Sequence, residues 1–212
     1  EREMSISLDF IKIANEYKIP TFVLGVGLGG LIILNLLEKT ELPIEGILLF
    51  SPMLELKRDY KGRKNKLISN VGKISKDTRF KVGITPQDLT RNDEIIEETA
   101  NDGLMLKKVT YSWYNLINEK MKETMDHIRD IKPISALIMY GTKDKILETQ
   151  SINEMKDKLK SKEMYFKVWD GLYHEIHNEP ERDLVMRYVL SFLNNSVNTC
   201  LLYTSPSPRD LS

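Results

Sequence analysis

Short apolar runs alternate along this chain with longer amphipathic patterns. Four continuous apolar runs predict buried strands, at residues 21–24, 46–50, 135–140 and 164–168. Three longer patterns predict helices, at residues 28–38, 149–159 and 180–193. Strands that alternate with helices, each strand apolar along its length, predict an α/β fold whose mostly parallel sheet carries helices on both faces.

One long interval, residues 54–130, breaks this alternation. It holds no convincing buried strand, and it looks helical and strongly polar, with an amphipathic patch near Trp113. Such a length is uncommon for a simple connection, so we expect an inserted helical cap or lid. The expected organisation is a core formed by residues 1–53 and 131–195, the cap between them, and a disordered or artefactual tail at 196–212.

Charge is balanced over the whole chain but segregated within the cap interval. Thirty-one basic residues offset thirty-one acidic ones, so no overall field draws the protein towards nucleic acid. Residues 57–81 are strongly basic, whereas residues 88–102 are strongly acidic. A pair of solvated helix faces is the simpler interpretation. The alternative is a basic rim that meets anionic lipid head groups, giving peripheral membrane contact through the cap.

The composition is that of a soluble domain. With 212 residues, 41% of them hydrophobic, the chain can bury a substantial core. Its longest apolar runs are far too short to span a bilayer, and we expect a cytoplasmic protein. The only cysteine is Cys200, which leaves no disulfide or thiolate site to consider. The sequence indicates no oligomeric state.

Both ends of the chain need separate treatment. The first residues already follow a helical pattern through Phe10, Ile13 and Tyr17, which predicts a chain truncated at its N-terminus, with sheet strands missing upstream. Residues 200–210, CLLYTSPSPRD, resemble a translated transposase sequencing adapter. A Ser/Pro-rich disordered tail is the weaker alternative. We therefore expect a gene fragment of metagenomic type with an artefactual C-terminus.

The stretch TFVLGVGLGGLIIL, residues 21–34, fits two incompatible motifs. Gly25, Gly27 and Gly30 spell G-x-G-x-x-G between a predicted strand and a predicted helix, as in a dinucleotide-binding turn. The same stretch also fits a G-x-S-x-G nucleophile elbow in which Gly27 has replaced the serine. In the second interpretation Gly25 and Gly29 permit the tight turn, and Gly30 lets the helix pack closely.

The surrounding sequence favours the elbow. A dinucleotide site needs an acid at the end of the second strand, roughly 20 residues on, but that strand ends in Phe50, Ser51 and Pro52. An elbow needs an acid after a later strand and a histidine after the last one, and Asp144 and His174 stand in those places. Loops at the carboxyl ends of parallel strands converge, so we expect these residues to meet Gly27.

Other candidate groups carry less weight. His174 and His177 form HEIH, but the zinc motif is H-E-x-x-H and no third ligand is in view, so we expect neither a metal nor another cofactor. His127 lies on a polar segment and is expected to be exposed. Ser51 precedes a proline at a strand end, which indicates a turn residue rather than a substitute nucleophile.

These motifs together carry a resemblance to a known family. The chain resembles the α/β-hydrolases of the monoacylglycerol lipase and lysophospholipase (serine aminopeptidase-like) branch, of bacterial type, over residues 8–195. The motifs that carry it are IPTFVLGVGLGGLI, LLFSP, LTRNDEIIEETANDGL, LIMYGTKDKI and GLYHEIHNEPERD. The resemblance implies an α/β-hydrolase fold and a small-molecule lipid ester as substrate. It also implies that Asp144 orients the base, that His174 is the general base, and that the Leu28 N–H is half of the oxyanion hole.

Two departures from the family predict an inactive copy. Gly27 has no oxygen to acylate, and the family's other oxyanion donor belongs to a His-Gly-type loop that would lie upstream of Glu1. Three explanations of Gly27 remain open. They are a single base change or read error in a serine codon, a genuine pseudohydrolase that binds a lipid or protein partner, and relief of backbone strain at the elbow.

Overall fold

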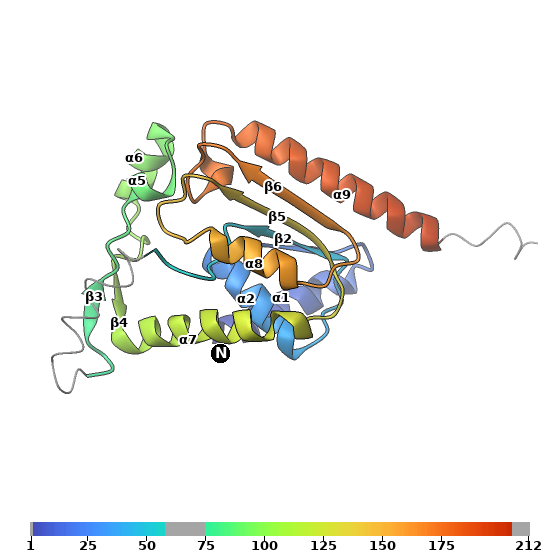
Figure 1. Ribbon diagram of the computed structural model, residues 1–212, viewed down its shortest axis with the longest axis horizontal. Helices are drawn as coiled ribbons and strands as arrows, with labels where there is room; N and C mark the ends of the chain where they lie inside the picture. The colour runs from blue at the N-terminus through green and yellow to red at the C-terminus, as the bar shows by residue number, and fades with distance from the viewer. Residues whose placement is uncertain (1, 58–74, 205–212) are drawn as a thin grey trace, which may run out of the picture.

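A computed structural model describes residues 2–57 and 75–204 of the chain (Figure 1). The first part contains α1 (Arg2–Glu16), β1 (Phe22–Val26), α2 (Leu28–Lys39) and β2 (Gly46–Phe50). The middle part contains β3 (Arg79–Lys81), α5 (Pro86–Leu89), α6 (Asp93–Asn101), β4 (Lys108–Thr110), α7 (Tyr111–His127) and the 3₁₀ turn η1 (Ile128–Asp130). The last part contains β5 (Ser135–Gly141), α8 (Gln150–Lys158), β6 (Met164–Trp169), the 3₁₀ turn η2 (Ile176–Asn178) and α9 (Arg182–Thr204).

The core is a parallel sheet of four strands in the order β1-β2-β5-β6. Val26 pairs with Phe50, and Phe50 pairs with Met139, so the strands end near one another along one edge. The segments that follow β1, β2, β5 and β6 leave from this edge. They carry Gly27, Asp144 and His174, as the elbow interpretation requires, and also Ser51.

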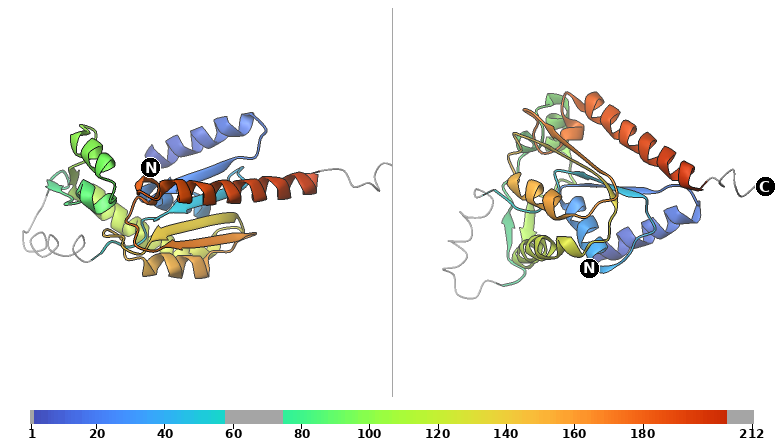
Figure 2. Two further views of the ribbon diagram at one scale, coloured as in Figure 1. Left: turned by 90° about the horizontal axis from the view of Figure 1, so that it is seen from above. Right: turned by 45° about the vertical axis from the view of Figure 1, so that its right-hand side comes forward.

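Helices cover both faces of the sheet, because alternate residues of each strand point to opposite sides. Leu49 and Ile138 pack in one core cluster with apolar residues of α2, α7 and α8. Leu48 and Leu137 pack in a second cluster with Val185 and Phe192 of α9. Strands β5 and β6 lie between α8 and α9 in both views of Figure 2. The predicted mostly parallel α/β architecture with helices on both faces is confirmed.

Apart from the last helix, the predicted elements agree with the observed bounds to within two residues. The β2 strand has the predicted bounds, α2 ends one residue later than predicted, and α8 begins one residue later and ends one residue earlier. The sequence pattern predicts Pro180 in the first turn of the last helix, but this residue lies in a turn just before α9. At its other end α9 continues to Thr204, into the predicted tail, because adding residues to an existing helix costs little. Residues 205–212, with most of the adapter-like stretch, lie outside the described residues.

The cap is not purely helical. Its described part adds a two-stranded antiparallel sheet, in which Phe80 of β3 pairs with Val109 of β4. Val109 is buried, and the Phe80 ring meets the Tyr114 ring of α7 edge-on, with centroids 5.4 Å apart. Strands of three residues are too short to leave a period-two signal, which explains why the sequence pattern missed them. In Figure 1, β3, β4, α5 and α6 lie at the left, and α7 runs from there to the centre, along the lower side of the molecule in that view.

Two expectations concern membranes: contact through the basic stretch of the cap, and the lack of a segment that spans a bilayer. Residues 58–74, which hold most of the basic stretch, lie outside the described residues, so membrane contact through it stays a prediction. Within residues 2–57 and 75–204, no helix is both long enough and apolar enough to cross a bilayer.

Candidate active site

The turn between β1 and α2 places Gly27 in a conformation that side chains rarely adopt. Its φ is 51° and its ψ is −113°. The Gly27 N–H donates to the Phe50 carbonyl at 3.0 Å, and the Gly27 carbonyl accepts from the Met53 N–H at 2.9 Å. The end of β2 therefore fixes the elbow backbone without any side chain at position 27.

Close packing explains two of the other glycines but not the third. A Cβ at Gly25 would lie 2.6 Å from the Gly30 nitrogen, and a Cβ at Gly30 would lie 2.8 Å from the Cβ of Pro52. A Cβ at Gly29 would meet no atom of the described residues within 4 Å, apart from its chain neighbours and the backbone of its own helix. The expected need for glycine at position 29 is therefore wrong, because that position faces open space on α2.

A side chain at position 27 would point at His174. A Cβ built on Gly27 lies 3.0 Å from His174 Nε2 and 3.6 Å from Cε1. Within residues 2–57 and 75–204, no other atom beyond the chain neighbours comes within 4 Å of it. A hydroxyl one bond further out would therefore lie within reach of the ring nitrogen. This is the geometry in which a histidine can take a proton from a nucleophile.

Asp144 holds the other side of the His174 ring. Its Oδ2 lies 2.8 Å from His174 Nδ1, and both side chains are buried. The second carboxylate oxygen, Oδ1, accepts from the backbone N–H groups of Ile146 at 2.8 Å and Leu147 at 3.0 Å. With the Nδ1 proton donated to Asp144, Nε2 is the acceptor that faces position 27. The structure thus brings Gly27, Asp144 and His174 together.

Leu28 is the first residue of α2. The first N–H groups of a helix have no acceptor within the helix, and they sit at its positive end. The Leu28 N–H is therefore free of the helical ladder and immediately follows the elbow. Such a group can stabilise an oxyanion that forms beside position 27.

The segment that carries His174 is tied to the ends of β2 and β5. The Ser51 hydroxyl, fully buried, donates to the His174 carbonyl at 2.8 Å, and the Lys143 N–H donates to the Leu172 carbonyl at 2.9 Å. A Cβ at Gly141 would collide with that same Leu172 carbonyl, so β5 and the histidine segment need glycine there. Ser51 is occupied in holding His174, which fits its assignment as a turn residue.

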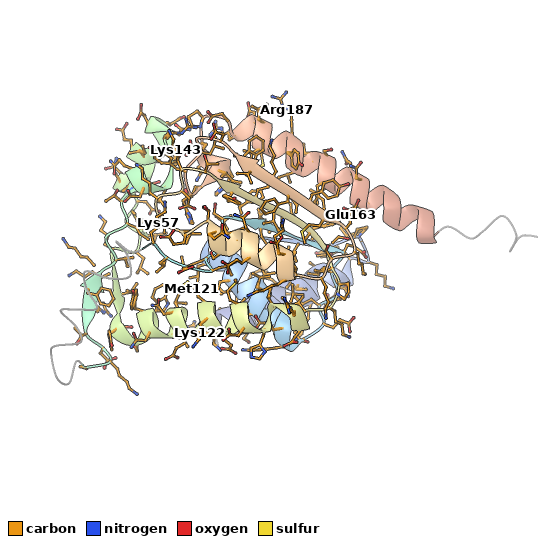
Figure 3. All side chains as sticks on the ribbon, in the orientation of Figure 1. Lys57, Met121, Lys122, Lys143, Glu163 and Arg187 are labelled. Carbon is orange, nitrogen blue, oxygen red and sulfur yellow. The ribbon has the colours of Figure 1, made fainter. Side chains whose placement is uncertain are left out.

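The acid segment has a tie of its own. The Lys57 ammonium donates to the backbone carbonyl of Asp144, and Lys57 is labelled in Figure 3. The residue comes from the segment after β2, just before the undescribed part of the cap. Both segments at the site are therefore connected to the chain that follows β2.

A segment of the cap also grips the histidine segment. The Glu179 side chain is fully buried and accepts from the Tyr173 N–H at 3.0 Å, from the Arg91 N–H at 3.2 Å and from Arg91 Nε at 2.7 Å. Arg91 also donates to Glu181 at 2.5 Å, which raises the pKa of Arg91 and lowers the pKa of Glu181. The Glu175 N–H adds a bond to the Leu89 carbonyl at 2.8 Å. We call Arg91, Glu179 and Glu181 the cap clasp.

Sequence reasoning missed the cap clasp, although both halves lie in the motifs that carry the family resemblance. Arg91 belongs to LTRNDEI and Glu179 to HNEPERD, and 88 positions separate them. An arginine in an otherwise acidic stretch and a buried acid after the histidine were the available signals. Only the fold shows that they pair.

The other two histidines have no part in this arrangement. Burial lowers the pKa of His177, whose ring lies 6.1 Å from that of Phe50, and His177 Nδ1 is buried without a hydrogen-bond partner in the structure described. His127 is exposed as predicted, and its bond to Asp130 raises its pKa. No group of three or more metal-ligating side chains occurs within the described residues.

Comparison with known proteins identifies the family. The family described as "Serine aminopeptidase, S33" matches residues 2–181, from α1 through the site. The chain belongs to this family. That match confirms the α/β-hydrolase relationship that the motifs indicated, and it spans the elbow, the cap and the acid and histidine segments.

Relatives of this S33 family member include named lipases. Phospholipase YtpA of Bacillus subtilis (strain 168) is 28% identical over 185 residues, which are 87% of this chain and 71% of that protein. Monoacylglycerol lipase of Mycolicibacterium smegmatis is 37% identical over 57 residues, which are 27% of this chain and 20% of that protein. The chain thus lies among lipase-like and esterase-like hydrolases.

Solved structures of low sequence identity share the fold. Monoacylglycerol lipase of Paleococcus ferrophilus superposes with a TM-score of 0.79 at 22% identity, covering 92% of this chain and 74% of that one. A soluble variant of monoglyceride lipase from Saccharomyces cerevisiae gives the same TM-score at 17% identity, covering 92% and 68%. The predicted α/β-hydrolase fold is confirmed.

Proposed function

We propose that this chain has the site of a carboxylic ester hydrolase acting on monoacylglycerols or lysophospholipids, and that Gly27 stands where the nucleophilic serine belongs. One observation carries the proposal: the direction of a side chain at position 27 leads to His174 Nε2, with the built Cβ 3.0 Å away. A turn that served only to pack β1 against α2 would not need to aim at a buried histidine held by an aspartate.

With a serine at this position the chemistry follows from the geometry. His174 Nε2 takes the hydroxyl proton as the oxygen attacks the ester carbonyl, and Asp144 holds the ring and stabilises its charged form. The Leu28 N–H donates to the developing oxyanion. The alcohol leaves with the proton from His174, and water then releases the acyl group. Gly27 supplies no oxygen, so the chain as it stands forms no acyl intermediate by this route.

An apolar groove supports a lipid substrate. It follows α2 from Leu28 to Lys39, between α1 and α7, and has a volume of about 510 Å³. Leu31, Ile32, Trp113 and other apolar side chains line it. Because the groove begins at the residue after Gly27, we propose that it receives the acyl chain of the ester. The names of the relatives, a phospholipase and monoacylglycerol lipases, point to the same substrate class.

Restoring the nucleophile tests the proposal. The Gly27→Ser chain, the chain as it stands and the double variant Gly27→Ser/His174→Ala are assayed on monoacylglycerols and lysophospholipids of short and medium chain length. We expect Gly27→Ser to exceed the glycine chain on the order of 10³-fold or more, and the double variant to lose that gain. No gain from Gly27→Ser in a folded protein would contradict the proposal.

A second function is favoured by the same glycine. The fold keeps Asp144, His174 and the groove without the reactive oxygen, so a pseudohydrolase could hold a lipid without cleaving it. Titrating the chain with a non-hydrolysable monoacylglycerol ether, followed by tryptophan fluorescence, tests this because Trp113 lines the groove. Independent reads of codon 27 complete the test. Serine in those reads ends the pseudohydrolase interpretation, and glycine in all of them ends the read-error interpretation.

A further inference from the structure

A Cβ built at Gly27 shows how much space lies in front of His174 Nε2. Apart from the two His174 ring atoms, no atom of the described residues other than the chain neighbours lies within 4 Å of a Cβ built at Gly27. A serine would add a methylene and a hydroxyl there, a volume close to the roughly 30 Å³ that one water molecule occupies in the liquid. Position 27 therefore leaves room for a water molecule next to the ring nitrogen.

We propose that the chain with Gly27 hydrolyses activated esters directly, with His174 as the general base for an attacking water molecule. This inference rests on the proposed ester-hydrolase function but uses no acyl intermediate. The substrates would be short-chain esters with a good leaving group, such as aryl esters. Without a covalent nucleophile, glycerol esters, whose alcohols leave poorly, would react far more slowly.

The reaction balances with water as the only co-reactant. The water oxygen bonds to the carbonyl carbon while one water proton passes to His174 Nε2, and the Leu28 N–H donates to the oxyanion. The bond from carbon to the leaving oxygen then breaks, and the proton on Nε2 is available to that oxygen. The products are the carboxylic acid and the alcohol, and His174 returns to its starting state.

The groups that hold His174 do not depend on the residue at position 27. Asp144 Oδ2 accepts from Nδ1 at 2.8 Å, and Asp144 is itself fixed by the N–H groups of Ile146 and Leu147. Ser51 fixes the His174 backbone. A positioned general base contributes typically 10² to 10⁴-fold to a reaction of this kind. His174 is therefore positioned to act as a general base even though position 27 has no side chain.

The test uses the chain as it stands and p-nitrophenyl acetate as the probe. Turnover is compared for the chain, His174→Ala, Asp144→Asn and the matched control His127→Ala, whose histidine is exposed and pairs with Asp130. We expect His174→Ala to lose on the order of 10²-fold, Asp144→Asn to lose most of the rate, and His127→Ala to retain it. Progress curves should be linear from the first turnover, with no burst of p-nitrophenol and no acyl adduct in the mass spectrum.

Two results would overturn the inference. One is a rate unchanged in His174→Ala, and the other is a burst with an acyl adduct on any residue of the glycine chain. Should His174→Ala fail to fold by circular dichroism, His174→Gln replaces it in the same comparison. If Gly27→Ser hydrolyses esters but the glycine chain shows no His174-dependent rate, this inference fails while the proposed function stands. If Gly27→Ser is inactive in a folded chain, the proposed function itself fails.

Discussion

The candidate site has two halves, and they differ in what forms them: side chains in the acid and histidine half, and backbone alone in the elbow half. In the acid and histidine half, Asp144 and His174 are both buried, and the oxygens and nitrogens that orient them have partners at 2.8 to 3.0 Å. In the elbow half only the backbone remains, with Gly27 at a φ of 51° and its peptide groups bonded to Phe50 and Met53. The packing of β1, α2 and β2 therefore shapes the elbow without any side chain at position 27.

The largest effect should come from removing His174 after a serine has been introduced at position 27. In a Gly27→Ser background, His174→Ala should lower kcat/KM on the order of 10⁴-fold or more, because nucleophile and base act as one unit. Steady-state kinetics on a short-chain ester measure the loss, with His127→Ala as the control. A loss of less than 10-fold would mean that position 27 and His174 do not act together.

Substitution by alanine should change the free energy of unfolding in opposite directions at Gly27, in the strained elbow, and at Gly29, in the first turn of α2. Gly27→Ala should lower the free energy of unfolding by about 1–3 kcal/mol, because a side chain at that φ is strained and its Cβ lies 3.0 Å from Nε2. Gly29→Ala should raise it by roughly 0.5–1 kcal/mol, because its Cβ would clash with no atom in the described part of the chain and alanine favours a helix. Urea unfolding of both variants decides this, and equal shifts would contradict the account.

The cap clasp should help to position His174, so its loss should lower kcat. In the Gly27→Ser background, Glu179→Gln should lower kcat about 10-fold, equivalent to about 1.4 kcal/mol, while KM stays within about 2-fold. The reason is that Glu179 accepts from the N–H of Tyr173, next to His174, and binds Arg91. Glu181→Gln removes only the negative charge of the outer partner of Arg91 and serves as the control. A change confined to KM, or equal effects of the two variants, would contradict a positioning role for Glu179.

The smallest effect concerns the two histidines outside the site. Burial lowers the pKa of His177, so the unfolded chain takes up its proton first as the pH falls. The contribution of neutral His177 is present above the usual histidine pKa of about 6.5 and is lost as the pH falls below it. His177→Gln should therefore reduce the loss of stability between pH 8 and pH 5.5 in urea unfolding.

His127 provides a control of opposite sign. Its pKa is raised by Asp130, so its contribution is present at low pH and is lost as the pH rises through the folded-state pKa. His127→Gln should therefore make the loss on acidification slightly larger. If both variants changed the loss of stability on acidification in the same direction, burial would not be what sets the pKa of His177.

The sequence predicted the core and the order of the site residues because both leave local signals. Continuous apolar runs give the four parallel strands, and Asp144 and His174 each follow such a run. The cap left weaker signals, since β3 and β4 have three residues each. The cap clasp left none that could be paired, because the contact between Arg91 and Glu179 exists only after the cap has folded onto the histidine segment.

The central claim is that this site is a serine hydrolase site that lacks one oxygen. Labelling Gly27→Ser with a fluorophosphonate, followed by peptide mass spectrometry, tests that claim most directly. The account predicts a single adduct on position 27 that is lost in Gly27→Ser/His174→Ala. It also predicts no adduct on Ser51, whose hydroxyl is buried and bonded to the His174 carbonyl. No adduct on a folded protein, or an adduct on Ser51 alone, would contradict it.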